Sequence, residues 1–332
     1  MSPSMKILVT GANGFIAHHL IDHILKEQGT QVEVFGTMRR YPAKGERRWA
    51  ASAVALLEMD LTDAHAVNKV MRDVLPDRVF HLAGESQVSR SWDSSTTAIN
   101  VNGLGTLNVL NAMHENGLDD SYVQVAGSSE EYGLVGAEEI PIREDIQPLR
   151  PLSPYAVSKI AADMFGHQFA RSYGMNILRT RTFNQTGPGR GEQYVDSGFA
   201  RQVALIEAGL KAPVIDHGNL EAVRDFTDVR DTVRAYWILS CLRWEGEVIN
   251  VCSGRGRRIA DALAGIVKMS TRSDIVLRAD PSRQRPSDVP VSVGSVEKLH
   301  RAIAWAPVIP YERSLSDMLE YWRDAISDGA RA

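Results

Sequence analysis

Short apolar runs without polar alternation recur through the first half of the chain, separated by longer stretches with helical periodicity. The runs lie at 6–10, 32–37, 55–59, 78–84, 122–128 and 176–183. The helical stretches cover about 15–27, 63–75, 95–116 and 154–173. Runs of this kind are typical of strands buried on both faces of a parallel sheet. Their alternation with helices predicts an α/β fold with a doubly wound parallel sheet.

The segment VTGANGFIA at 9–17 joins the first strand to the first helix. One glycine permits the tight turn, and the next lets a pyrophosphate approach the helix N-terminus, where free N–H groups favour an anion. The GxxGxxA spacing is wider than that of the commonest dinucleotide fingerprint, and a glycine-rich turn without a ligand is the alternative. We expect the cofactor to contact this turn through Gly11, Asn13, Gly14, Phe15 and Ile16.

The residues after the second strand indicate which dinucleotide binds. An acidic residue there would bind the ribose 2′-hydroxyl of NAD, but this strand ends GTMRR. Arg39 and Arg40 suit a 2′-phosphate, so we favour NADP(H), with NAD(H) second; two solvated surface arginines are the alternative. Further cofactor contacts are expected from Asp60 and Leu61 near the adenine, and from Leu82, Ala83 and Gly84 on the nicotinamide ribose side.

The pattern loosens after Asn184, where glycine, proline and arginine become frequent. The later segments VRDFTDVRD and EVINVCSG look like a return to the first domain. We therefore expect a dinucleotide-binding domain of residues 1–184 with a return segment at about 226–254. A smaller substrate-binding lobe of residues 185–225 and 255–332 would cover the carboxyl ends of the strands, where ligands bind in open α/β sheets.

The segment YAVSK opens the helix that follows RPLSP. Tyr155 and Lys159 are four residues apart and share one helix face. A lysine ammonium near a phenol lowers the pKa of the tyrosine, which then exchanges a proton with a carbonyl or carbinol oxygen. Ser128, at the end of the apolar run 122–128, would hold the same oxygen. An isolated YxxxK is common on helix surfaces, but the order of glycine-rich turn, serine-ended strand and YxxxK is more specific.

These motifs together resemble the extended short-chain dehydrogenases/reductases of the nucleotide-sugar-modifying type. TGxxGxxA, HLAG, SSEEYG, YAVSK and RTFNQTGPG all stand in family order, and the resemblance covers essentially the whole chain. It implies a Rossmann fold and an NAD(P)H-dependent enzyme with Ser128, Tyr155 and Lys159 as catalytic triad. It also implies a cytoplasmic homodimer in which the helices near 95–116 and 154–173 form a four-helix bundle.

Three later segments, GNLEAVRDFTDVRD, NVCSG and RPSDVP, resemble the reductase subgroup that acts on GDP-4-keto-6-deoxy-D-mannose. This resemblance implies reduction of the C4 keto group with NADPH or NADH, giving GDP-D-rhamnose, with Tyr155 as proton donor. It also implies a set of residues that bind the GDP-sugar: Ser86, Ser128, Glu130, Asn184, Arg201, Arg224, Arg285 and Asp288. For each arginine a surface charge is the alternative, and for Arg224 an ion pair with Asp225 or Asp228.

Glu130 raises a second interpretation of the activity. It stands where the related GDP-mannose 4,6-dehydratases have their base, and residues two apart in an extended strand face the same way. Ser128 and Glu130 would then both point into the cleft, whereas Glu131 would face away as a structural or solvated group. We favour the reductase because its motifs span more of the chain. A non-enzymatic dinucleotide sensor is disfavoured, since such proteins commonly lose the tyrosine or the lysine.

Composition excludes several other classes. The formal net charge is −4, without the basic excess that nucleic acids or anionic membranes require. No apolar run is long enough to span a bilayer, and the N-terminal MSPS lacks a signal-peptide core. Cys241 and Cys252 are too few for a disulfide framework and have no partners at zinc spacing, so we expect no metal site.

Overall fold

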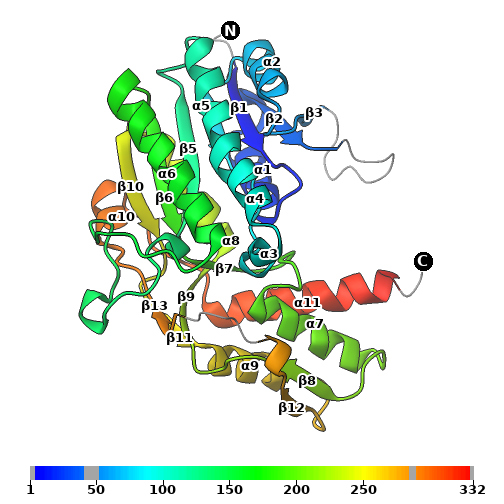
Figure 1. The fold of residues 1–332 in the computed structure, drawn as a ribbon. Helices are drawn as coiled ribbons and strands as arrows, with labels where there is room; N and C mark the ends of the chain where they lie inside the picture. Colours follow the sequence, from blue (N-terminus) through cyan, green and yellow to red (C-terminus); the bar gives the residue numbers. More distant parts are fainter. Residues whose placement is uncertain (1–3, 41–51, 284–288, 330–332) are drawn as a thin grey trace.

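The computed structural model describes residues 4–40, 52–283 and 289–329. Seven strands form one sheet in the order β10-β6-β5-β4-β1-β2-β3, and every neighbouring pair is parallel. The strands are β1 Met5–Thr10, β2 Val32–Met38, β3 Val54–Glu58, β4 Arg78–His81, β5 Tyr122–Ser128, β6 Ile177–Thr182 and β10 Glu245–Val251. The predicted doubly wound parallel sheet is confirmed (Figure 1).

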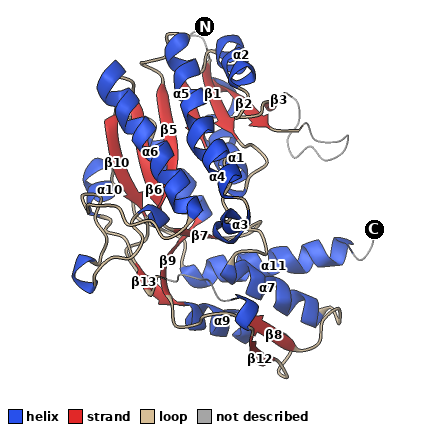
Figure 2. Ribbon diagram, in the orientation of Figure 1, coloured by secondary structure: helices blue, strands red, loops and turns tan. Residues whose placement is uncertain are grey.

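Helices cover both faces of this sheet (Figure 2). One face carries α2 Ala64–Val74, α5 Gly105–Glu115 and α6 Pro154–Tyr173, and the other carries α1 Phe15–Gln28 and α8 Val229–Leu239. Successive side chains of a strand point to opposite faces. Accordingly, Ile7 and Val9 belong to the core under α1 and α8, while Leu8 belongs to the core under α2, α5 and α6. Two-sided burial explains why the strand sequences lack polar alternation.

The helix boundaries follow from local sequence. Ser153 caps α6 by accepting a hydrogen bond from the Ala156 N–H at 3.1 Å, Pro154 occupies the first turn, and Gly174 ends the helix with φ +70°. The helical stretch predicted at 95–116 comprises α4 Ser95–Ala98, a π-helical turn η2 Ile99–Leu104, and α5. A short helix α3 Val88–Asp93 precedes it, and the one-turn η1 Gly29–Gln31 follows α1.

A smaller lobe lies beyond the carboxyl ends of the strands (Figure 1). Its core is built from α7 Val195–Glu207, α9 Ile259–Lys268 and α11 Tyr311–Gly329, beside the parallel pair β8 Val214–His217 and β12 Val276–Ala279. A second small sheet joins β7 Asn184–Thr186, β9 Val223–Asp228, β11 Gly256–Arg258 and β13 Val291–Ser292. The one-turn helices η3 Ser129–Glu131, η4 Ala137–Glu139 and η5 Pro281–Arg283, and the short α10 Glu297–Ala302, complete the described elements.

The two segments read as a return to the first domain behave differently. Within 247–254, β10 pairs with β6 at the edge of the main sheet. Within 223–231, β9 instead pairs with β7, β11 and β13 in the small sheet, and only the following α8 packs against α1. The sequence VRDFTD of β9 carries three charged residues, unlike the apolar strands of the main sheet, although its last four residues are all buried.

Candidate functional site

The turn between β1 and α1 is shaped by two glycines. Gly11 has φ +70°, and a Cβ atom there would lie 2.8 Å from the Cα of Ala83, so neither the conformation nor the space admits a side chain. The Gly14 N–H donates to the Gly11 carbonyl at 2.8 Å and precedes α1. Among the described residues no side chain caps α1, and its first turn holds no acidic residue. Its N-terminal N–H groups therefore suit an anion.

The loop after β4 lies against this turn. The Thr10 hydroxyl accepts hydrogen bonds from the N–H groups of Leu82 and Ala83 at 3.1 and 3.0 Å. His81 contacts Thr10 at 2.9 Å and Thr106 at 3.0 Å through its two ring nitrogens, and burial lowers its pKa to about 3. A neutral histidine with both nitrogens engaged holds the loop in place, which brings the HLAG segment to the turn where the strand order reverses.

Arg39 and Asp60 lie near each other at the ends of β2 and β3. Arg39 and Arg40 are exposed. The Asp60 carboxylate accepts from the N–H and hydroxyl of Thr62, and these hydrogen bonds, aided by Arg39, lower its pKa. Leu61 is buried against Gly105, where a Cβ atom would approach the Leu61 Cβ to 2.9 Å. The predicted adenine-side residues thus share one corner of the sheet with the predicted phosphate-side arginine.

Ser128, Tyr155 and Lys159 converge at the carboxyl end of β5. Ser128 is the last residue of β5, and Tyr155 and Lys159 lie on the first turns of α6. The Lys159 ammonium donates to the Ala126 carbonyl at 2.8 Å and lies 6.0 Å from the centre of the Tyr155 ring. Ser128 and Tyr155 are each only 8% exposed. The structure thus brings these three side chains together, and their catalytic roles stay a prediction.

The protonation of this group differs from the sequence expectation. Burial raises the pKa of the Tyr155 phenol, and a hydrogen bond with Ser128 opposes this only in part. Burial also lowers the pKa of Lys159 to about 8, against the opposing field of Glu131. We expected Lys159 to lower the pKa of Tyr155, and that expectation was wrong. Burial of the phenol raises its pKa more than the Lys159 ammonium, which is directed at Ala126, can lower it. Tyr155 remains protonated and can donate.

Glu130 and Glu131 do not continue the strand. β5 ends at Ser128, and Ser129–Glu131 form a 3₁₀ turn, so the expectation that alternate residues face the same way through Glu130 was wrong. The turn forms because the Ser128 hydroxyl accepts from the Glu130 N–H while the Glu131 carboxylate accepts from the Ser128 N–H. Glu130 is half-buried and its charge acts on Tyr155. Glu131 is fully buried, a structural group and not a solvated one.

The expected substrate residues are spread over the junction with the lobe. Asn184 begins β7 opposite Phe226 of β9. Arg224 is half-buried on β9 and donates to the Val223 carbonyl at 2.9 Å. Arg201, on α7, makes an ion pair with Glu192 at 2.9 Å. Two others, Arg285 and Asp288, lie outside the described residues.

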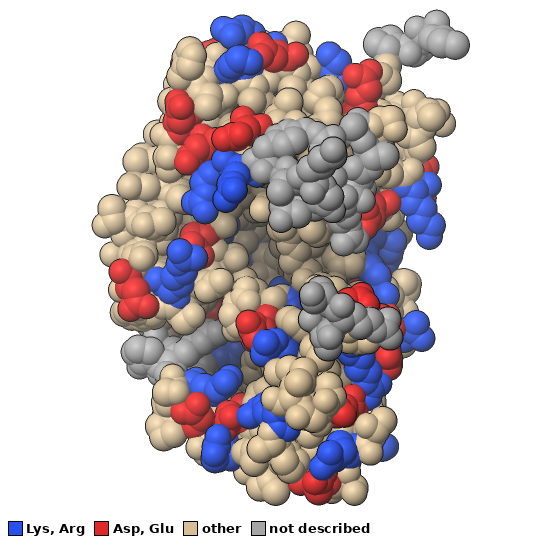
Figure 3. All heavy atoms as spheres, turned by 90° about the vertical axis from the view of Figure 1, so that its right-hand side faces the viewer, with Lys and Arg blue, Asp and Glu red and all other residues tan. Residues whose placement is uncertain are grey.

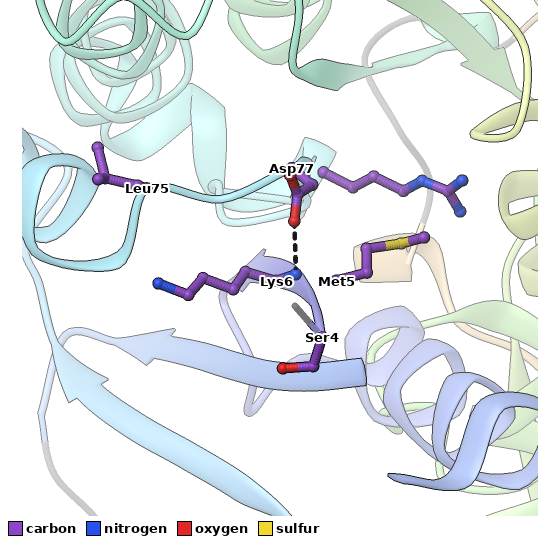
Figure 4. A pocket seen from close by; sticks show the side chains of 6 residues that line it. Ser4, Met5, Lys6, Leu75 and Asp77 are labelled. Carbon is purple, nitrogen blue, oxygen red and sulfur yellow. Dashed lines mark hydrogen bonds between the residues drawn. The ribbon is translucent and has the colours of Figure 1, made fainter. Parts of the chain in front are cut away.

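Figure 3 shows the surface hollowed between the part that holds the main sheet and the small lobe. A separate open pocket lies at the other end of the sheet, at the amino ends of β1 and β4 (Figure 4). It is lined by Ser4, Met5, Lys6, Leu75, Asp77 and Arg78, and the Lys6 N–H donates to the Asp77 carboxylate within it at 2.7 Å. This pocket is remote from the carboxyl ends of the strands and holds none of the expected site residues.

Comparison with known proteins identifies the family. The family described as GDP-mannose 4,6 dehydratase matches residues 8–318. The chain belongs to this family. It is therefore an extended short-chain dehydrogenase/reductase of the nucleotide-sugar type and an NAD(P)-dependent oxidoreductase by family, which confirms the resemblance stated from the motifs.

Relatives within the family carry both of the activities that the sequence suggested. The chain is 30% identical to GDP-6-deoxy-D-mannose reductase of Pseudomonas aeruginosa over 98% of this chain and 99% of that protein. It is 29% identical to GDP-mannose 4,6-dehydratase of Yersinia enterocolitica, over 95% and 92% of the two chains. Among solved structures, RMD from Pseudomonas aeruginosa complexed with NADPH is 29% identical with a TM-score of 0.82, covering 97% of this chain and 100% of that one.

Asn102 was not singled out from the sequence. It is buried in the π-helical turn η2, where its amide oxygen accepts from the Glu85 N–H at 2.8 Å and its amide nitrogen donates to the Glu85 carbonyl and the Ser158 hydroxyl. It thereby ties the loop after β4 to the YAVSK helix. Nothing in INVNGL distinguishes this asparagine from a helix-surface residue, because its partners lie 17 and 56 residues away.

Arg190 was also missed. Its guanidinium lies 3.7 Å from the Tyr194 ring centre and 5.3 Å from that of Phe15, the first residue of α1. The Tyr194 hydroxyl contacts the Ser86 hydroxyl at 2.9 Å. A cation is thus held between the phosphate turn and the expected substrate residue Ser86. The motif RTFNQTGPG ends one residue before Arg190, so the signal was adjacent in the sequence.

The close approach of Gly11 to Ala83 generates a stability prediction. Gly11→Ala should lower the free energy of unfolding by more than Gly174→Ala, measured by chemical denaturation. Gly174 has the same φ of +70°, but no atom lies within 4 Å of the position that a Cβ would take there. Its replacement therefore costs only the left-handed conformation, about 1–2 kcal/mol. Equal losses in the two variants would show that the contact with Ala83 does not constrain the turn.

Proposed function

We propose that this protein reduces the C4 keto group of GDP-4-keto-6-deoxy-D-mannose to give GDP-D-rhamnose. The observation that carries the proposal is the buried Tyr155 beside Ser128 and Lys159, at the same edge of the sheet as the glycine turn. The relative named GDP-6-deoxy-D-mannose reductase supports it, since that match extends over 98% of this chain.

The proposed cofactor is NADP(H), with NAD(H) as the second candidate. The residues fit such a group, because the N-terminus of α1 suits a pyrophosphate and Gly14, which immediately precedes α1, carries no side chain that would keep the anion from the backbone. Exposed Arg39 suits a 2′-phosphate, and a similar structure is described as complexed with NADPH. When bound, the dinucleotide supplies the hydride. The proposed contacts are Gly11, Asn13, Gly14, Phe15, Ile16, Arg39, Asp60, Leu61, Leu82, Ala83, Gly84, Tyr155 and Lys159.

The side chains of this protein would donate the proton and stabilise the negative charge that develops during the reaction. Tyr155 donates its proton to the C4 oxygen as that oxygen becomes an alkoxide, and the Ser128 hydroxyl holds the same oxygen. The phenolate that Tyr155 becomes is stabilised by the Lys159 ammonium on the same helix face.

With a pKa of about 8, most of the Lys159 side chains are charged at neutral pH. Activity should fall as pH rises through that value.

We further propose that residues 185–225 and 255–332 bind the GDP-sugar while residues 1–184 and about 226–254 carry the cofactor. Guanidinium groups are bidentate partners for the two phosphates of a sugar nucleotide. Arg201 would have to exchange Glu192 for a phosphate, whereas Arg224 already lies on β9 at the junction. The full proposed substrate set is Ser86, Ser128, Glu130, Asn184, Arg201, Arg224, Arg285 and Asp288.

A second candidate is the 4,6-dehydratase reaction. The position of Glu130 favours it, because this carboxylate lies close enough to Tyr155 for its charge to raise the pKa of the phenol. In that reaction Glu130 would remove the C5 proton after oxidation at C4. Relatives named GDP-mannose 4,6-dehydratase match over more than nine-tenths of this chain.

The reductase assignment predicts consumption of NADPH when the purified protein meets GDP-4-keto-6-deoxy-D-mannose. Tyr155→Phe should lower kcat by about 10²–10⁴-fold, because the proton donor is lost while the ring remains. NADPH absorbance and chromatography of the product measure both. Absence of ketone reduction by the wild type, or full turnover by Tyr155→Phe, contradicts the proposal. Conversion of GDP-mannose without net cofactor consumption identifies the dehydratase instead.

Glu130→Gln separates the two candidates within the site. In a reductase the variant should keep most of its ketone reduction, since no C5 proton has to be removed. In a dehydratase it should lose about 10²–10⁴-fold in turnover of GDP-mannose, the contribution of a positioned base. The same assays measure both, and a near-total loss of ketone reduction with an unchanged melting temperature would make Glu130 catalytic after all.

We propose that the protein is a homodimer paired through η2–α5 and α6. Four large apolar side chains on these elements are exposed by 40% to 47%: Leu104, Val157, Met164 and Tyr173. Val157 and Met164 are seven residues apart on α6 and share one face. An apolar face of this kind is costly to leave in water.

Both cysteines are free thiols, which supports our placing the protein in the cytoplasm.

Val157→Glu combined with Met164→Glu should convert a dimer into a monomer, because two carboxylates would be buried unpaired at the interface. Light scattering after size-exclusion chromatography measures the mass. Leu210→Glu is the control, since Leu210 is 63% exposed on the lobe. A wild type that elutes as a monomer contradicts the proposal.

Within the described ranges, no helix combines the length and the apolar character that a membrane span needs.

A further inference from the structure

Glu131 is a buried acid for which neither proposed mechanism has a use. Its exposure is 0%. One carboxylate oxygen accepts from the Ser128 N–H at 2.7 Å and the other accepts from the Nε of Arg181 at 2.9 Å. Burial and the neighbouring Asp163 raise the pKa of Glu131 to about 8, while Arg181 and the Ser128 N–H oppose that shift. Both oxygens accept from N–H donors, which favours the carboxylate form. The backbone of the serine in the proposed triad is therefore held by this side chain.

The arginine that pairs with Glu131 continues the network to the helix. Arg181 is 1% exposed on β6, and its Nη2 donates to the Asp163 carboxylate at 2.8 Å. The same oxygen of Asp163 accepts from Arg179 at 2.9 Å. Asp163 lies on α6 four residues after Lys159, which places the two side chains on one helix face. The chain of contacts thus runs from Ser128 to the helix that carries Lys159.

The connection closes back on β5. The Lys159 ammonium donates to the Ala126 carbonyl, two residues before Ser128. A ring of contacts therefore links the end of β5, the turn η3, β6 and α6, and then returns to β5. The ring contains the serine and the lysine of the proposed triad.

Two features indicate that this network orients the residues of the site more than it stabilises the fold. Buried ion pairs lose much of their attraction to desolvation, and apolar residues of similar volume are often equally or more stabilising. The network also restricts its surroundings, because a Cβ atom at Gly127 would lie 2.4 Å from a Glu131 carboxylate oxygen.

We propose that Glu131, through its contacts with the Ser128 N–H and Arg181, is a positioning residue that sets the placement of Ser128 and Lys159 for the reduction. This inference rests on the proposed function for its reaction, but not for its geometry. The charged groups that face Glu131 are Arg181, Asp163 and Lys159. Among them Lys159 belongs to the proposed triad, and Glu131 is the group whose charge opposes the effect of burial on the pKa of this lysine.

Glu131→Gln tests the proposal with a matched control. Glu139 caps the turn η4 in the same way, since its carboxylate accepts from the Gly136 N–H at 2.6 Å and from Arg150 at 2.7 Å. Glu139→Gln therefore removes the same charge from the same motif, away from the triad. The first readout needs no cofactor: pH-dependent acylation of the Lys159 amine, followed by mass spectrometry. The second is the pH profile of kcat for ketone reduction.

In Glu131→Gln we expect Lys159 to become acylated at lower pH than in the wild type, because the ammonium has lost a stabilising anion. The alkaline limb of the kcat profile should move in the same direction. At neutral pH, kcat should fall by at least about tenfold, a part of the ~10²–10⁴ that a positioned proton donor contributes, with KM little changed. Glu139→Gln should match the wild type in all these readouts.

A second variant covers the case in which Glu131→Gln folds poorly. Glu131→Leu with Arg181→Met replaces the pair by apolar groups and leaves Arg179 as the partner of Asp163, so the melting temperature should recover in part while kcat stays low. Recovery of both stability and kcat in this double variant overturns the proposal, as does unchanged acylation of Lys159 in a folded Glu131→Gln. If the wild type reduces no ketone but the acylation shift appears, the proposed function fails and the role of Glu131 in placing Lys159 stands.

Discussion

The parallel pairing of β1, β4 and β5 is the constraint on which the site depends. Thr10 pairs with His81, and His81 with Val125, so the three strands end at the same edge of the sheet. The glycine turn and the HLAG loop follow the ends of β1 and β4, and Ser128 is the last residue of β5. Residues more than 100 positions apart thereby come together, because the backbone ladder aligns the ends of the strands.

The burial of Tyr155 and Lys159 then determines which proton transfers are possible at this edge of the sheet. It raises the pKa of Tyr155 and lowers that of Lys159 to about 8, so the phenol keeps its proton while the lysine titrates near neutrality. A proton donor next to a cation suits the direction from ketone to alcohol. The buried Glu131–Arg181–Asp163 network links the end of β5 to α6, the helix that carries Tyr155 and Lys159.

A single turn bears on the choice between reductase and dehydratase. Because β5 stops at Ser128, the side chains of Glu130 and Glu131 are directed by a 3₁₀ turn and not by strand alternation. Both raise the pKa of Tyr155, but only Glu131 also accepts hydrogen bonds from the Ser128 N–H and Arg181. Two adjacent glutamates of the same chemistry thus have different environments.

The sequence alone determined the sheet, the order of its strands and helices, and the meeting of Ser128 with Tyr155 and Lys159, because these depend on local periodicity and on the fixed polarity of parallel strands. Tertiary structure alone decided the roles of Asn102, Arg190 and Glu131, whose partners are distant in the chain or lie on other elements. It also decided the protonation of Tyr155, since a pKa depends on desolvation, and the extent of burial is set only when all the layers have packed.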